Sequence, residues 1–190
     1  MNVHASIKLR MGEVDIMLHN VDTVVCAEYS TSVSIDTIKL DAQRVISYLY
    51  PYKNSLNLSI MITDNKYITE LNSTFRGIPE STDVLSFSPI ETIQPGEPSD
   101  DVFNNLLEDQ LGDIVISYEE IEKQSHTYKQ SREEVLSFLL IHGLLHLSGY
   151  DHATQSELVQ MQQKESELLN HLNLSSQIVY EMYDAQRLKG

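Results

Sequence analysis

The chain has 190 residues, 41% of them hydrophobic and 22% charged, a composition typical of globular proteins that excludes a disordered or fibrous one. This length predicts a single domain over residues 1–190, large enough to bury a core without disulfides. Cys26 is the one cysteine, which excludes an internal disulfide framework and favours a reducing, cytoplasmic compartment. No stretch approaches the ~20 apolar residues of a membrane-spanning helix, and residues 1–13 lack the apolar run of a signal peptide. We therefore expect a soluble intracellular protein with no membrane partner.

The net charge is −15, from 28 acidic and 13 basic residues. Such a balance does not favour a nucleic-acid-binding protein, which usually carries a basic patch. The acidic residues are unevenly distributed, because residues 91–109 contain six of them and no Lys or Arg. We expect much of the excess charge to lie on a loop there, away from any site.

The first half of the chain is predicted to alternate strands and helices. Apolar residues alternate with polar ones where strands are expected, and recur every three or four residues where helices are expected. Pro51 and Gly77 stand where the two helices should end, and Pro89 follows the last strand. The predicted elements are a strand over 14–18, a helix over 35–50, a strand over 56–62, a helix over 68–75 and a strand over 83–88.

The second half begins with a predicted loop over residues 90–109, with a turn of helix expected at 102–107. A strand over 112–117 follows, and then three helix starts with the Ser/Thr-x-x-Glu pattern of a capping box. The second of these helices, over 132–147, is apolar nearly all round and is therefore predicted to be buried. A further short helix is expected within 171–190. The three capping boxes are Ser117 with Glu120, Ser131 with Glu134, and Thr154 with Glu157.

This order of elements predicts an α/β (α+β) fold, with a single mixed sheet of about four strands flanked by helices. The central buried helix carries two histidines four residues apart, His142 and His146, which share one helix face and can chelate one metal ion. Gly149 is placed to end the helix in a left-handed turn, after which His152 can return to the same point. Three histidines leave one tetrahedral position open, as in a catalytic zinc site. Purely structural histidines are the less favoured interpretation, because each would need a buried polar partner.

The spacing His-x-x-x-His-x-x-Gly-x-x-His matches the metzincin zinc-protease motif, with one departure. The protease carries its general base, a glutamate, directly after the first histidine, where this chain has Gly143. Glycine cannot accept a proton. The predicted metal site is kept and the protease base is lost, so a zinc peptidase that uses another base stays as an alternative.

The segment His-Gly-Leu-Leu-His-Leu-Ser-Gly-Tyr-Asp-His, residues 142–152, resembles the metal motif of the YbeY family of bacterial endoribonucleases. Two earlier stretches agree in order. Residues 71–87 resemble the family's Leu-Asn-x-x-Tyr-Arg and Thr-Asp/Asn-Val-Leu-Ser-Phe, and residues 111–117 resemble its Leu-Gly-Asp-Ile strand. The chain departs from the family pattern at Phe75, where Tyr is common, and at Ser81 and Ser88, where Pro is common.

The resemblance implies a metal-dependent endoribonuclease specific for single-stranded RNA. It also implies a role in 3′-end maturation of small-subunit ribosomal RNA and in ribosome quality control, with precursor RNA and the ribosome as partners. Arg76 matches the family's functionally important arginine. We therefore predict Arg76 and His142 as catalytic residues. The predicted ligands of Zn²⁺, or of another divalent transition metal, are His142, His146 and His152.

Zinc held by three neutral imidazoles lowers the pKa of a bound water towards about 7, so no adjacent glutamate is needed to remove its first proton. Arg76 can offer a bidentate fork to phosphoryl oxygens, the alternative being a surface charge after a short helix. Asp151 can either orient a ligand histidine or hydrogen-bond its own turn. For Thr82, Asp83 and Ser86 two interpretations stay open, which are lining the cleft and ending a strand.

The negative charge also bears on the partner. RNA affinity comes mostly from neutralised phosphates, and this chain has 13 Lys and Arg. We therefore expect weak binding to free RNA and delivery to the substrate by a larger assembly such as the ribosome. The alternative from a different class is a non-catalytic metal-holding module that docks on the ribosome.

Overall fold

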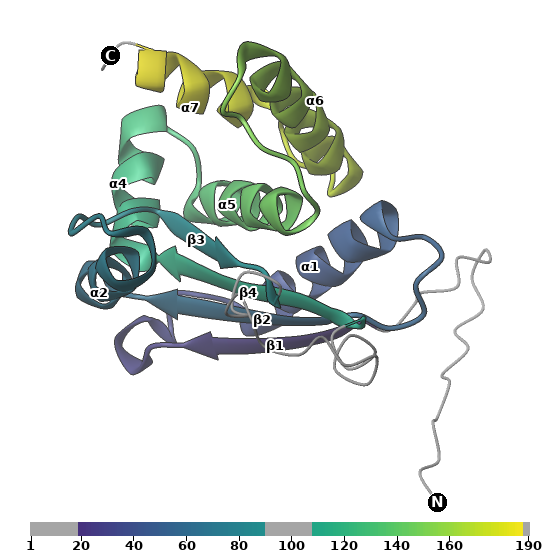
Figure 1. The fold of residues 1–190 in the computed structure, drawn as a ribbon. Coiled ribbons are helices and arrows are strands. Elements are labelled where there is room, and N and C mark those ends of the chain that lie inside the picture. Colours follow the sequence, from purple (N-terminus) through teal and green to yellow (C-terminus); the bar gives the residue numbers. More distant parts are fainter. Residues whose placement is uncertain (1–18, 90–107, 188–190) are drawn as a thin grey trace, which may run out of the picture.

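The computed structural model describes residues 19–89 and 108–187, with side chains described as far as Asp184 (Figure 1). The predicted strand over 14–18, the helical turn at 102–107 and most of the acidic loop lie outside these residues. In chain order the elements are β1 Asn20–Val25, the short 3₁₀ helix η1 Ala27–Tyr29, α1 Ile35–Leu49, β2 Asn57–Thr63, α2 Asn65–Arg76, β3 Val84–Phe87, β4 Gln110–Ser117, α4 Tyr118–Tyr128, α5 Arg132–Leu147, α6 Gln155–His171 and α7 Gln177–Arg187.

The four strands form one mixed sheet in the order β1-β2-β4-β3. The β1–β2 and β2–β4 pairs are parallel, and β3 runs antiparallel to β4. The predicted α/β class with a mixed four-stranded sheet is therefore confirmed. Strand β1 was not predicted, because an edge strand with polar Asn20 and Asp22 and an exposed Val24 has only a weak apolar alternation.

Alternation along the strands divides the core between the two faces of the sheet. In β2, Leu58, Ile60 and Ile62 are buried on the face that α1 and α5 cover, with α6 and α7 packed beyond α5 (Figure 1). On the opposite face, Ile68 of α2 packs with Leu85 and Val115 in a smaller cluster. Helix α5 thus lies between the sheet and an outer helical layer, and the prediction of a buried central helix is confirmed.

The helix ends follow local chemistry. Full capping boxes form at Ser131 and at Thr154, as predicted. The capping box predicted for Ser117 and Glu120 forms only in part. Ser117 caps α4 as predicted, but the prediction for Glu120 is wrong, because its carboxylate contacts Asn65 and Lys123 instead of the cap backbone.

Helix α2 begins three residues earlier than predicted, because the side chain of Asp64 caps it by accepting from the Tyr67 amide at 2.6 Å. Gly77 ends α2 in the left-handed region with φ 73°, as predicted. The short helix expected within the tail is α7. Among the described residues, no helix is both long and apolar enough to cross a membrane.

Candidate metal centre

Helix α5 presents His142 and His146 from the same face, one turn apart. Their Nε2 atoms lie 3.0 Å from each other. His152, from the turn after the helix, joins them, and one ring nitrogen from each of the three lies within 4.8 Å of the others. The structure therefore brings the three predicted ligands together around one point.

The return of the chain to that point depends on how α5 ends. The Tyr150 amide donates to the carbonyl of Leu145, and the Gly149 amide donates to the carbonyl of His146, both at 3.0 Å. These two bonds are those of a Schellman motif, which needs a left-handed residue just past the helix. Gly149 takes that conformation with φ 86°, at little cost since it has no Cβ. His152 follows three residues later and closes the cluster.

The three imidazoles sit at the edge of the core. His142 and His146 are partly buried, and His152 is exposed. Burial, together with the nearby His142 and His152, lowers the pKa of His146 to about 4. His146 is therefore neutral near pH 7, which is the form in which an imidazole binds a metal.

A buried glutamate that the sequence analysis did not single out contacts the cluster from α6. This glutamate is Glu165. It is 0% exposed, and its Oε1 lies 2.7 Å from Nδ1 of His142. The same oxygen accepts from the hydroxyl of Tyr183 in α7 at 3.0 Å. One signal could have identified it: Glu165 lies four residues after Met161 and three before Leu168, on the apolar stripe of α6, where a carboxylate needs a reason to be buried.

For Asp151, the sequence left two roles open, which are orienting a ligand histidine and hydrogen-bonding its own turn. Its carboxylate accepts from the backbone amide of His152 at 2.8 Å, which supports the turn interpretation. The side chain is exposed, and its negative charge opposes the lowering of the pKa of His146.

The cluster lies in a cleft of about 640 Å³, whose wall includes Arg76 at the end of α2. One guanidinium nitrogen of Arg76, Nη2, donates to the carbonyl of Ser86 at 3.0 Å. The guanidinium carbon lies 5.8 Å from the centre of the Phe87 ring. Ser86 in turn donates through Oγ to the carbonyl of Gly143 at 3.2 Å. Strand β3 thus connects the arginine to the helix that carries the histidines.

Thr82, Asp83 and Ser86 all line this cleft, so the first of their two interpretations holds. Asp83 has a local role as well. Its Oδ2 accepts from Gln124 at 2.7 Å, and its Oδ1 accepts from the Val84 amide at 2.9 Å. The carboxylate of Asp83 is thereby anchored to α4 and to the start of β3.

Gly143 packs against the sheet. A Cβ placed there would lie 3.1 Å from atoms of Ile114 and from Oγ of Ser86. Any larger side chain at this position would therefore require the side chains of Ile114 and Ser86 to shift by a few tenths of an ångström, and glycine itself supplies no proton acceptor.

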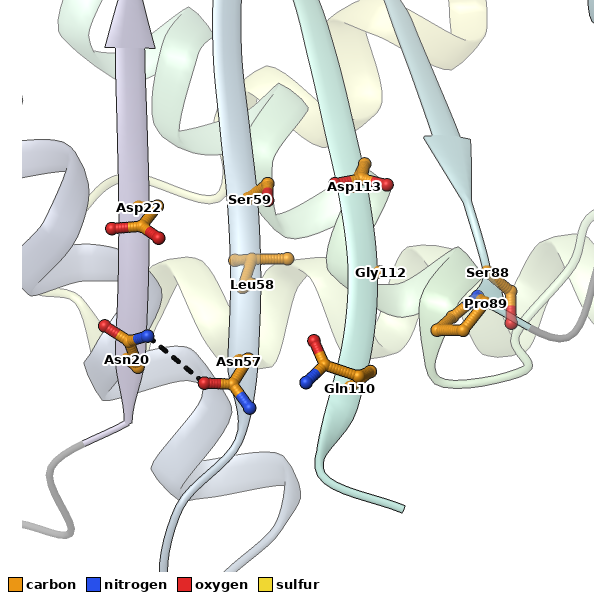
Figure 2. Close-up of a pocket in the computed structure, with 10 residues that line it drawn as sticks. All are labelled: Asn20, Asp22, Asn57, Leu58, Ser59, Ser88, Pro89, Gln110, Gly112 and Asp113. Atoms are coloured by element: carbon orange, nitrogen blue, oxygen red, sulfur yellow. Dashed lines mark hydrogen bonds between the residues drawn. The ribbon is translucent and has the colours of Figure 1, made fainter. Parts of the chain in front are cut away.

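A second hollow, of about 360 Å³, lies over the starts of β1, β2 and β4 (Figure 2). Of the lining residues that the structure describes, Asp22 and Asp113 are the charged ones and none is a histidine. Asp113 precedes Ile114 in β4, so its side chain projects from the face of the sheet opposite to α5. Among the described residues, the lining of this hollow offers neither a metal ligand histidine nor a cation for phosphate.

The donor set suits a divalent transition metal. Three imidazole nitrogens converge, one ring is oriented by a carboxylate, and a second ring is held neutral. Imidazole ligands favour zinc, copper, iron or nickel over calcium and magnesium, which prefer oxygen. The assignments of His142, His146 and His152 as ligands, and of Arg76 and His142 as catalytic residues, stay predictions that this geometry supports.

The fold and the cluster together define an α/β protein with a cleft in which three histidines converge, a candidate metal site. A profile of the family described as Endoribonuclease YbeY matches residues 24–173. A relative named Endoribonuclease YbeY from Clostridioides difficile (strain 630) is 40% identical over 124 residues, covering 65% of this chain and 76% of its own length. Another of that name from Caldicellulosiruptor saccharolyticus is 34% identical over 148 residues, covering 78% of this chain and 93% of its own. The chain belongs to the YbeY family. The relatives above are named as endoribonucleases, which are nucleases and hydrolases.

Proposed function

We propose that this protein is a metal-dependent endoribonuclease that hydrolyses phosphodiester bonds in single-stranded RNA. The observation that carries the proposal is the convergence of three imidazoles in a cleft that Arg76 also lines. The proposed metal is Zn²⁺, because three nitrogen ligands leave it the open fourth position of a catalytic site. The names of the relatives supply the substrate class.

The residues of the cleft have two different roles in this proposal. A bound zinc ion supplies Lewis-acid charge and lowers the pKa of water towards about 7. His142, His146 and His152 hold the ion. Arg76, oriented by the carbonyl of Ser86 and by the ring of Phe87, is placed to bind phosphoryl oxygens and to stabilise their negative charge as the bond breaks.

The biological substrate in this proposal is precursor ribosomal RNA. The protein would act in the cytoplasm, in 3′-end maturation of the small-subunit RNA and in ribosome quality control. The resemblance of the motifs supports this role, and the charge is consistent with it. With 28 acidic and 13 basic residues, the protein needs the ribosome to present RNA to its cleft.

The experiment compares wild-type protein with His146→Ala and with the matched control His126→Ala, which removes an exposed histidine of α4. Metal content by mass spectrometry and cleavage of a labelled single-stranded RNA are measured for each. We expect His146→Ala to lose the bound metal and to cleave at least about 100-fold more slowly, since the metal provides most of the activation of water. The control should keep both properties. A His146→Ala protein with full metal content and full activity would overturn the proposal.

Casein and RNA, given to the same samples, separate the alternatives. Cleavage of casein but not RNA would indicate the peptidase, which would need a base other than residue 143, a glycine. Metal-loaded protein that cleaves neither, yet binds ribosomes, would indicate the docking module. RNA cleavage that is present in the metal-containing samples and lost with the metal would support the endoribonuclease.

A further inference from the structure

Glu165 is a buried carboxylate between the helix that carries the histidines and the C-terminal helix. It is 0% exposed, and its Oε1 is shared by Nδ1 of His142 at 2.7 Å and the hydroxyl of Tyr183 at 3.0 Å. A carboxylate oxygen only accepts, so both partners donate to it. Nδ1 of His142 therefore carries the ring proton, and Nε2 presents its lone pair.

That tautomer is the one the cluster requires. Nε2 of His142 faces Nε2 of His146 at 3.0 Å, whereas Nδ1 points the other way, to Glu165. We infer that Glu165 and Tyr183 are positioning residues of the metal centre, which hold His142 in the tautomer and orientation that bind the ion through Nε2. The inference rests on the metal-binding part of the proposed function.

The second oxygen of Glu165 supports this role. Oε2 is buried and has no hydrogen-bond partner among the described residues. A buried carboxylate with one unpaired oxygen is costly by itself, and positive charge nearby offsets the cost. An ion bound at Nε2 of His142 places that charge on the far side of the ring that Glu165 contacts.

Through Tyr183, the C-terminal helix α7 contributes a side chain to this group of contacts. It lies beyond residues 24–173, the segment that the family profile matches. Its ring is 7% exposed, it lines the cleft with Met182, and its neighbours Ile178 and Val179 belong to the main core. Helix α7 is therefore held firmly enough to fix the hydroxyl against Glu165. The proposed positioning pair thus includes one residue beyond the segment that the family profile matches.

The test measures metal affinity and not cleavage. Zn²⁺ is titrated against a chromophoric chelator for wild type, Glu165→Gln and Tyr183→Phe, and the tautomer of His142 is read from its ring nitrogen shifts by NMR. Two matched controls remove the same groups elsewhere on the same helices: Glu167→Gln on α6, and Tyr180→Phe, whose ring is 63% exposed, on α7.

We expect Glu165→Gln to weaken Zn²⁺ binding by about 10–100-fold, as other substitutions of carboxylates behind ligand histidines do. Tyr183→Phe keeps the carboxylate and loses one hydrogen bond to it, so a loss of about three- to tenfold is expected. Both should increase the share of the other tautomer of His142 in the metal-free protein. The controls should bind as wild type does.

Unchanged affinity and an unchanged tautomer in folded Tyr183→Phe and Glu165→Gln would overturn the inference and leave the proposed function intact. If Glu165→Gln does not fold, Tyr183→Phe decides alone, since it removes a single oxygen atom. A wild-type protein that binds no Zn²⁺ would instead contradict the proposed function. Failure of either idea is thus distinguishable from failure of the other.

Discussion

Two histidines of this protein, His142 in the cleft and His19 at the start of the sheet, differ in what Nδ1 of the imidazole meets. In the cleft, Nδ1 of His142 faces the carboxylate of Glu165 at 2.7 Å. At the start of the sheet, Nδ1 of His19 accepts from the backbone amide of Leu56 at 3.2 Å. His142 therefore offers Nε2 as an acceptor, whereas His19 carries its proton on Nε2, which is buried without a partner among the described residues.

The difference shows that the group behind a histidine decides what the ring can do. A carboxylate behind Nδ1 frees Nε2 for a metal, and two further imidazoles are present to complete the cluster. An amide donor at Nδ1 leaves His19 as a structural side chain that connects β1 to the start of β2. Among the described residues that line the hollow over the strand starts, the charged ones are Asp22 and Asp113, and none is a histidine (Figure 2). From this comparison we expect the chemistry to take place in the cleft, and His19 to contribute to stability at the start of the sheet.

The sharpest test on the cleft side is Arg76→Ala. We expect RNA cleavage to fall by about 100-fold while metal content stays full, because loss of one preorganised donor to a developing oxyanion typically costs that much. The matched control is Arg132→Ala, which removes a surface arginine paired with Glu122. Steady-state cleavage and metal analysis are measured on the same preparations. Should Arg76→Ala lose metal as well, or cleave at the wild-type rate, the division between ion-holding and phosphate-binding residues would be wrong.

The next test concerns His19 and the dependence of stability on pH. Burial lowers the pKa of His19 below its usual value of 6.5. The unfolded chain therefore takes up the proton first as the pH falls, so the contribution of neutral His19 to stability is present above pH 6.5 and is lost as the pH drops below it. Urea unfolding of metal-free protein at pH 7.5 and 5.5 measures the loss.

His19→Asn is the comparison for this measurement, because its Oδ1 can accept from the Leu56 amide without titrating. We expect the wild type to lose more stability between the two pH values than the variant does. The rest of the chain is identical in the two proteins, so its contribution cancels in the comparison. An equal loss in both would mean that His19 is protonated without cost in the folded state, against its burial.

Much of the fold and of the cleft could be predicted because the signals are local. The spacing of His142 and His146, the glycine at 149 and the capping residues act over four or fewer residues, and the structure places these elements as the pattern indicated. The alternation of apolar and polar residues predicted for β2 is likewise confirmed, since Leu58, Ile60 and Ile62 are buried. Each of these features is decided by neighbours in sequence.

The contacts that were missed are those that only packing creates. Glu165 and Tyr183 lie 23 and 41 positions beyond His142 in the numbering. No local pattern on α6 or α7 shows that Glu165 meets Nδ1 of His142, or that Tyr183 donates to Glu165. Strand β1 depends on its parallel partner β2 for its hydrogen bonds, so its own composition signals it poorly. The orientation of a ligand histidine is thus a tertiary property, even where the ligand itself is evident from spacing.

The smallest effect is expected at the polar hollow over the strand starts. Asp113→Asn removes a carboxylate from that face and leaves the pairing of β4 with Ser59 and Phe87 unchanged. Since the described lining of the hollow has no metal ligand cluster and no cation for phosphate, metal affinity and RNA cleavage should both stay within about twofold of wild type, as for most surface substitutions. The same titration and cleavage assays apply, with Asp22→Asn as a second, independent removal of charge. A tenfold gain in cleavage with either variant would show that the RNA passes over this face, where the carboxylates would then repel its phosphates. In that case the two regions would belong to one substrate-binding surface, connected through Ser88, which lines both hollows.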